Sequence, residues 1–202
     1  PPFVMEGREH LDQALADGKG ALLVSAHFTA LEMGGRLLSG EVKFDAVYRQ
    51  HENPAFEYIM AGNRNRHAEN AIPRGDIRGM VRALRKNHAV WFAADQAPKF
   101  KRLTELVPFF GEPAKTVVAT SRIAKMSGAP LVPFFTLRSE DDSHYRLIFK
   151  PPLENFPSED PIADALAINK VIEAQILEAP EQYLWVHKRF KKRGKAYPNL
   201  YA

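Results

Sequence analysis

Short apolar segments alternate with helical patterns in the first half of the chain, and this alternation limits the possible folds more than any other feature. The apolar segments are residues 21–25, 44–49 and 88–94, each of a length typical of a buried strand. The clearest helical pattern follows Asp76, where apolar residues recur at helical spacing up to Leu84. Strands separated by helices indicate repeated βαβ units and therefore a mainly parallel sheet.

The second half of the chain adds two further apolar segments, residues 130–137 and 144–149, separated by a charged turn around Asp141. This pattern predicts an antiparallel hairpin added to the sheet. Residues 98–107 show no periodicity and predict an exposed loop. We therefore expect an α/β fold: a central, mostly parallel sheet with helices on both faces and an added antiparallel hairpin.

The amino-acid composition limits the size of the fold, the kinds of reactive group and the charge of the partner. The 202 residues, 45% hydrophobic and 26% charged, suit one globular domain with a substantial core. The absence of cysteine excludes disulfides, thiolate metal sites and thiol nucleophiles. A net charge of +4 and a pI near 9.3 favour an anionic partner, such as an acidic protein, a phosphorylated lipid or a nucleic acid.

The apolar segment 21–25 leads into His27, and Glu32 follows five residues later. In one regular helix these residues would lie roughly 140° apart, so they can share a site only if His27 lies on the turn before the helix. There a carboxylate could accept the Nδ1–H hydrogen bond and leave Nε2 free as a general base. The spacing alone is undemanding, because a solvated loop histidine near a surface glutamate gives the same pattern.

Polar residues follow the other predicted strands as well. Arg49 ends the segment 44–49, and Asp95 comes directly after the segment 88–94. Because the carboxyl ends of parallel strands meet at one edge of a sheet, we expect both residues to lie near His27.

A glycine-containing stretch, residues 108–116, precedes a helical pattern at residues 117–126. If Gly111, Lys115 and Thr116 lie at the helix start, free backbone N–H groups there would suit an anion. Ordinary capping by Thr116 explains the same pattern.

The chain ends in a dense basic run, residues 183–195, that also carries Trp185 and Phe190. Such a run is typical of a surface that meets nucleic acid or anionic lipid, or of a solvated tail. The two large apolar side chains disfavour the solvated tail.

These motifs together resemble the late acyltransferases of lipid A biosynthesis, the lauroyl/myristoyl transferase family within the lysophospholipid acyltransferase group. The resemblance extends from Gly7 onward. It rests on ordered motifs, which are Ser25-Ala26-His27 through Glu32-Met33-Gly34-Gly35, Val47-Tyr48-Arg49 with Asn53-Pro54, Arg74 through Met80, Asp95-Gln96, Phe109-Phe110-Gly111 with Pro113-Ala114 and Thr116, and Trp185 through Lys191.

The resemblance implies transfer of a fatty acyl chain, lauroyl or one of similar length, from acyl carrier protein to a hydroxyl of a phosphorylated lipid A precursor. It implies His27 as the general base and Glu32 as its orienting carboxylate, with no metal and no cofactor. The other positions that match family motifs are expected to bind substrate; these are Arg49, Asn53, Arg74, Asp95, Gln96, Gly111, Thr116, His187 and Arg189.

The family normally carries an amino-terminal membrane anchor, whereas this chain starts at Pro1. We therefore expect a single acyltransferase domain, residues 1–202, that lacks the anchor and works at the cytoplasmic face of the cell inner membrane. The expected partners are acyl carrier protein, a phosphorylated glycolipid acceptor and the anionic membrane surface, with no nucleic acid.

Three other functions fit parts of the sequence. One keeps the His27 and Glu32 chemistry and changes the acceptor to a lysophospholipid or another glycolipid. A second is a basic module that binds nucleic acid or a membrane surface through the carboxyl-terminal run. A third, a metal hydrolase, lacks any close histidine spacing of the kind that metal sites use.

Overall fold

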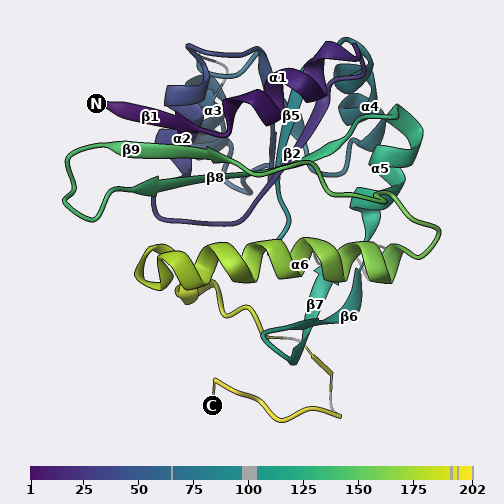
Figure 1. Ribbon diagram of the computed structural model, residues 1–202. Coiled ribbons are helices and arrows are strands. Elements are labelled where there is room, and N and C mark those ends of the chain that lie inside the picture. The colour runs from purple at the N-terminus through teal and green to yellow at the C-terminus, as the bar shows by residue number, and fades with distance from the viewer. Residues whose placement is uncertain (65, 97–103, 192, 195, 202) are drawn as a thin grey trace.

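A computed structural model describes residues 1–64, 66–96, 104–191, 193–194 and 196–201 (Figure 1). The central sheet has seven strands in the order β1-β9-β8-β2-β5-β3-β4. These strands are β1 (Phe3–Glu6), β2 (Ala21–Ser25), β3 (Phe44–Tyr48), β4 (Asn70–Pro73), β5 (Ala89–Ala93), β8 (Leu131–Arg138) and β9 (Tyr145–Phe149). Only β8 and β9 pair antiparallel among these neighbours, which confirms the predicted mostly parallel sheet with its added hairpin.

Helices cover both faces of the sheet, as predicted (Figure 1). Helices α1 and α2 pack on one face, and α4, α5 and α6 pack on the other. The helices are α1 (Arg8–Ala16), α2 (Leu31–Leu38), α3 (Pro54–Arg64), α4 (Ile77–Arg85), α5 (Ala119–Ser127) and α6 (Pro161–Glu178).

Successive residues of β2 are apolar because both faces of this strand are buried. Leu22 and Val24 point into the core beneath α4, α5 and α6, whereas Ala21 and Leu23 point into the core beneath α1 and α2. All four side chains are buried because a central parallel strand is covered on both faces. The strand is therefore a rigid support for the residues that follow it.

A second hairpin, which the sequence did not predict, lies on the far side of α6 from the sheet (Figure 1). It consists of β6 (Thr104–Phe109) and β7 (Glu112–Val117), joined by a tight turn in which Phe110 and Gly111 both have positive φ. The predicted loop over residues 98–107 is therefore wrong for residues 104–107, while residues 97–103 lie outside the described part. Prolines in both strands hid the pattern, since proline is normally confined to strand edges.

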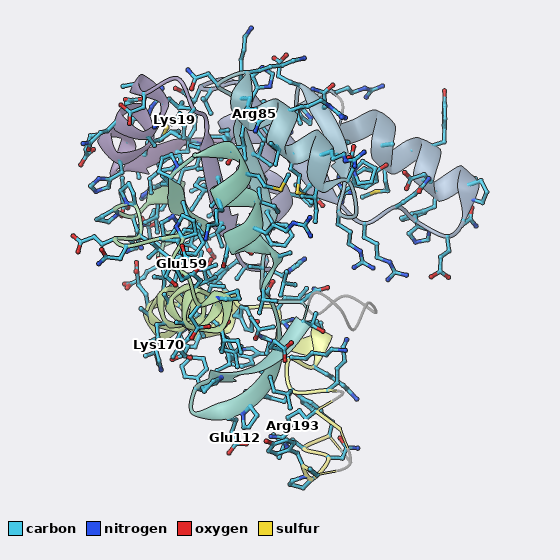
Figure 2. The ribbon with its side chains drawn as sticks, turned by 90° about the vertical axis from the view of Figure 1, so that its right-hand side faces the viewer. Lys19, Arg85, Glu112, Glu159, Lys170 and Arg193 are labelled. Carbon is cyan, nitrogen blue, oxygen red and sulfur yellow. The ribbon has the colours of Figure 1, made fainter. Side chains whose placement is uncertain are left out.

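The carboxyl-terminal segment packs against this hairpin. Arg193 is buried and donates to the carboxylate of Glu112 at 2.8 Å, and Figure 2 shows the two side chains together at the end of the hairpin. Arg189 is also buried. The basic run therefore contributes two of its cations to the interior of the fold.

In the parts of the chain that the structure covers, no helix combines the length and the apolar character that crossing a membrane requires.

Candidate active site

His27 lies on the turn between β2 and α2, as the sequence predicted. In the parallel pair β2–β5, Ser25 aligns with Ala93, so the residues two positions beyond each strand face one another. The Nδ1 atom of His27 lies 2.5 Å from Oδ1 of Asp95, and the His27 backbone N–H donates to Oδ2 at 3.1 Å. One carboxylate therefore fixes both the ring and the backbone of His27.

The side chain of Asp95 is fully buried. Burial by itself would raise its pKa, but the hydrogen bonds from the His27 ring and from the His27 backbone hold the pKa of Asp95 below its ordinary value. Because a carboxylate only accepts, Nδ1 of His27 carries the shared hydrogen. Among the described residues none bonds to Nε2, so this nitrogen is available as a proton acceptor.

The expected orienting role of Glu32 needs a correction. Glu32 lies in the first turn of α2, and its carboxylate accepts from Nη2 of Arg64 at 3.0 Å. Asp95 takes the Nδ1 position instead, because β5 is the direct neighbour of β2 and ends level with it. Glu32 keeps a place in the site, since it lines the same pocket as His27.

A pocket of about 510 Å³ opens beside His27, which is within the usual size range of ligand pockets, roughly 300–1,000 Å³. Its lining is largely apolar and comes from α2, β3, α3 and β5. The apolar residues are Leu31, Phe44, Ala46, Val47, Met60, Ala68, Trp91 and Ala93. The charged residues around it are Glu32, Arg36, Arg49 and Arg64. The site therefore joins a proton acceptor to an apolar cavity with a cationic rim.

Arg49 and Arg74 lie near each other, directly after the paired strands β3 and β4. Arg49 lines the pocket just beyond β3 and pairs with Glu52 at 2.7 Å, while Arg74 directly follows the adjacent strand β4. Burial and the nearby charge of Arg49 lower the pKa of Arg74. The carboxylate of Glu52 pairs with Arg49, and among the described side chains none forms an ion pair with Arg74.

Two further predicted residues lie close to these strand ends. Asn53 caps α3, because its side-chain oxygen accepts from the backbone N–H groups of Ala55 and Phe56. Gln96 is exposed directly after Asp95. Their contact with substrate stays a prediction.

Three predicted residues lie in or against the β6–β7 hairpin. Gly111 lies in the β6–β7 turn, and Thr116 lies within β7, so the expected anion cradle at a helix start is wrong. The hydroxyl of Thr116 accepts from Nη2 of Arg189 at 2.8 Å, and Nη1 of the same arginine donates to Lys115. Burial lowers the pKa of Arg189. These contacts tie the carboxyl-terminal segment to the hairpin.

The sequence reasoning missed Tyr183. Its hydroxyl donates to Oδ2 of Asp95 at 3.0 Å and lies 3.3 Å from Nε2 of His187. His187 ends the short 3-10 helix η3 (Trp185–His187), and its ring centre is 6.3 Å from that of His27. Tyr183 belonged to an aromatic, basic segment with no strand or helix pattern, so no local signal connected it with Asp95.

The chain is similar to a family of known proteins over nearly its whole length. A sequence model of the bacterial lipid A biosynthesis acyltransferases matches residues 2–192. The lipid A biosynthesis lauroyltransferase of Escherichia coli K12 is 39% identical over 196 residues, which are 96% of this chain and 64% of that protein. The palmitoleoyltransferase of the same strain is 38% identical over 200 residues, 98% of this chain and 65% of that protein.

Among solved structures, the 1-acyl-sn-glycerophosphate acyltransferase PlsC of Thermotoga maritima shares the fold. Its TM-score is 0.50 at 13% identity, over 88% of this chain and 72% of that one. The sheet, its two helical layers and this likeness define an α/β protein of the acyltransferase fold. The chain belongs to the bacterial lipid A biosynthesis acyltransferase family, and it spans just under two thirds of the length of the two Escherichia coli relatives above.

Proposed function

We propose that this protein transfers a fatty acyl chain from the thioester of acyl carrier protein to a hydroxyl of a phosphorylated lipid A precursor. The observation that carries the proposal is the pair of His27 and Asp95 at the edge of an apolar pocket. A fixed imidazole with a free Nε2 can activate a hydroxyl, and the apolar pocket suits an acyl chain. Membership of the lipid A biosynthesis acyltransferase family supports a lipid A-type acceptor.

The proposed reaction proceeds without an acyl-enzyme. The acceptor hydroxyl gives its proton to Nε2 of His27 as its oxygen attacks the thioester carbonyl carbon. The tetrahedral intermediate then expels the thiolate, which takes the proton from His27, so the products are an ester and a free thiol. Asp95 supports the step because it holds the ring and stabilises the transient imidazolium.

Glu32 and the arginines have separate proposed roles. Glu32, paired with Arg64 across the pocket, would contact the acceptor or hold α3 against α2. Arg49 and Arg74 would bind a phosphate, since guanidinium groups recognise phosphate with fixed geometry. Such cations also suit acidic carrier protein and anionic lipid, in keeping with a place at the cytoplasmic face of the inner membrane.

The test is a transfer assay with labelled acyl carrier protein as donor and purified acceptors supplied in parallel. We expect product with the phosphorylated lipid A precursor and a loss of about 10²- to 10⁴-fold in His27→Gln. His144→Gln, in the β8–β9 turn, serves as the matched control with full activity. Preferred transfer to a lysophospholipid or another glycolipid would favour that acceptor instead. No transfer, together with salt-sensitive binding of nucleic acid, would favour the binding module.

A further inference from the structure

Tyr183 shares the Asp95 carboxylate with His27. Oδ1 of Asp95 faces the His27 ring, and Oδ2 accepts from both the His27 backbone N–H and the Tyr183 hydroxyl. Tyr183 is 2% exposed, so this hydrogen bond is shielded from solvent. Burial and the negative charge of Asp95 raise the pKa of Tyr183, which therefore stays protonated and acts as the donor.

The segment that carries Tyr183 is bonded to the His27 turn on both sides. The N–H of Thr29 donates to the carbonyl of Gln182 at 2.8 Å, and the N–H of Leu184 donates to the carbonyl of His27 at 2.9 Å. Phe28 and Tyr183 thereby form an antiparallel bridge, with their rings edge to face at 5.7 Å. This arrangement places the phenol relative to His27 through backbone contacts.

The segment is also anchored to the sheet. Arg138, at the end of β8, donates its N–H to Oε1 of Gln182 and accepts from Nε2 of the same side chain. Residues 182–184 therefore connect β8 to the His27 turn. We refer to residues 182–184 as the strap.

His187 is a second possible acceptor for the hydroxyl proton of Tyr183. Nδ1 of His187 faces the Leu184 carbonyl at 2.5 Å, so it is the donor, and in the neutral ring Nε2 is then an acceptor. The single phenol proton thus has two acceptors, and the charged carboxylate at 3.0 Å is the stronger. The titratable or charged groups around Asp95 are His27, Tyr183 and His187, with Arg189 and Tyr201 next to Tyr183.

We propose that Tyr183 is a positioning residue for the general base: its hydroxyl fixes the Asp95 carboxylate in the orientation that holds His27, and the strap places that hydroxyl. This inference rests on the proposed function for its effect on rate, but not for its effect on the His27 ring. Loss of the hydrogen bond from Tyr183 to the buried Asp95 carboxylate should substantially weaken the hold of Asp95 on His27, because hydrogen bonds to charged groups in buried sites are strong.

Tyr183→Phe tests the proposal because it removes the hydroxyl and keeps the ring that packs on Phe28. We expect kcat to fall about ten- to hundredfold, with little change in KM. The acid limb of the pH–rate profile should move to higher pH, because an Asp95 without the phenol donor attracts the His27 imidazolium more strongly. NMR titration of the His27 ring should show the same shift without any substrate.

Tyr201→Phe is the matched control, since that phenol bonds the backbone N–H of Phe190 in the same carboxyl-terminal segment. It should leave the profile and the titration unchanged. An unshifted His27 titration in folded Tyr183→Phe would overturn the proposal. A loss of rate that is equal at every pH and is accompanied by a lower melting temperature would also overturn it, because it would indicate a purely structural role. Failure of the proposed function gives a different result. The wild-type chain would then transfer no acyl group to the lipid A precursor, or His27→Gln would keep full activity. The NMR titration of His27 would still show whether Tyr183 affects the ring.

Discussion

Asp95 and His27 are separated by 68 residues, yet the Asp95 carboxylate lies 2.5 Å from the His27 ring because each follows one of two adjacent parallel strands. The strand pair sets this contact, since the two residues occupy equivalent positions beyond β2 and β5. An acid–base pair built on strand ends is held by the sheet itself, which is a rigid support for chemistry.

This relationship predicts that Asp95 and Glu32 act differently on His27. Asp95→Asn should move the NMR titration of His27 to lower pH, because a neutral amide no longer stabilises the imidazolium, and transfer should fall by at least tenfold. Glu32→Gln should leave that titration in place, because the Glu32 carboxylate bonds Arg64. A shift with Glu32→Gln and none with Asp95→Asn would restore the orienting role first expected for Glu32.

Arg74 should affect the binding of a phosphorylated acceptor. Its guanidinium lies next to Arg49 and pairs with no carboxylate among the described residues. Arg74→Gln should raise KM for the phosphorylated acceptor about tenfold and weaken its dependence on salt, since a charge-assisted contact is lost. Steady-state kinetics at two salt concentrations measures this. Arg82→Gln, on the exposed side of α4, is the control, and equal effects from both variants would show that only net charge matters.

Gly34 should be essential to the packing of α2. A Cβ atom at this position would lie 2.0 Å from Oγ1 of the buried Thr136 on β8, so the helix or the strand would have to move. Gly34→Ala should lower the free energy of unfolding by about 1–3 kcal/mol, measured by urea denaturation. Gly62→Ala on α3 should not be destabilising, because nothing lies within 4 Å and alanine favours a helix. Equal stability of the two variants would contradict the close packing.

Acid should weaken the attachment of the edge strand β1. Arg146 on β9 donates to both carboxylate oxygens of Glu6, and this hydrogen bonding lowers the pKa of Glu6 below 4.5. As the pH falls, Glu6 therefore takes up a proton in the unfolded chain before it does so in the folded protein. The stabilisation by this pair is present above pH 4.5 and is lost as the pH falls below that value. Glu6→Gln should lower stability at pH 7 by about 0.5–1 kcal/mol, a small value because the pair is partly exposed.

The matching experiment compares unfolding between about pH 5 and pH 3 in the wild type, in Glu6→Gln and in Glu9→Gln, which changes an exposed carboxylate on α1. The decline in stability with acid should be shallower in Glu6→Gln alone. A parallel decline in all three proteins would mean that the Arg146 pair contributes nothing measurable.

Local sequence patterns were sufficient to predict several of the strands and the turn that carries His27. Apolar runs and helical spacing predicted the strands β2, β3 and β5, the β8–β9 hairpin and the turn that carries His27, because periodicity and turn position are properties of neighbouring residues. The same patterns failed for the β6–β7 hairpin, where prolines interrupt both strands and the pairing depends on packing against α6.

Strand order, in contrast, is a property of the whole chain. A second pair, His88 and Asp45, also joins an imidazole to a buried carboxylate at 2.7 Å, but it lies at the amino ends of β5 and β3, away from the pocket of His27. Sequence spacing cannot tell these two pairs apart. The sequence by itself determined that His27 follows a buried strand of a mainly parallel sheet. It also placed Asp95 at the same edge of that sheet. Only the tertiary structure decided that Asp95 rather than Glu32 bonds the His27 ring, and that Tyr183 bonds Asp95, because both contacts depend on how distant segments pack together.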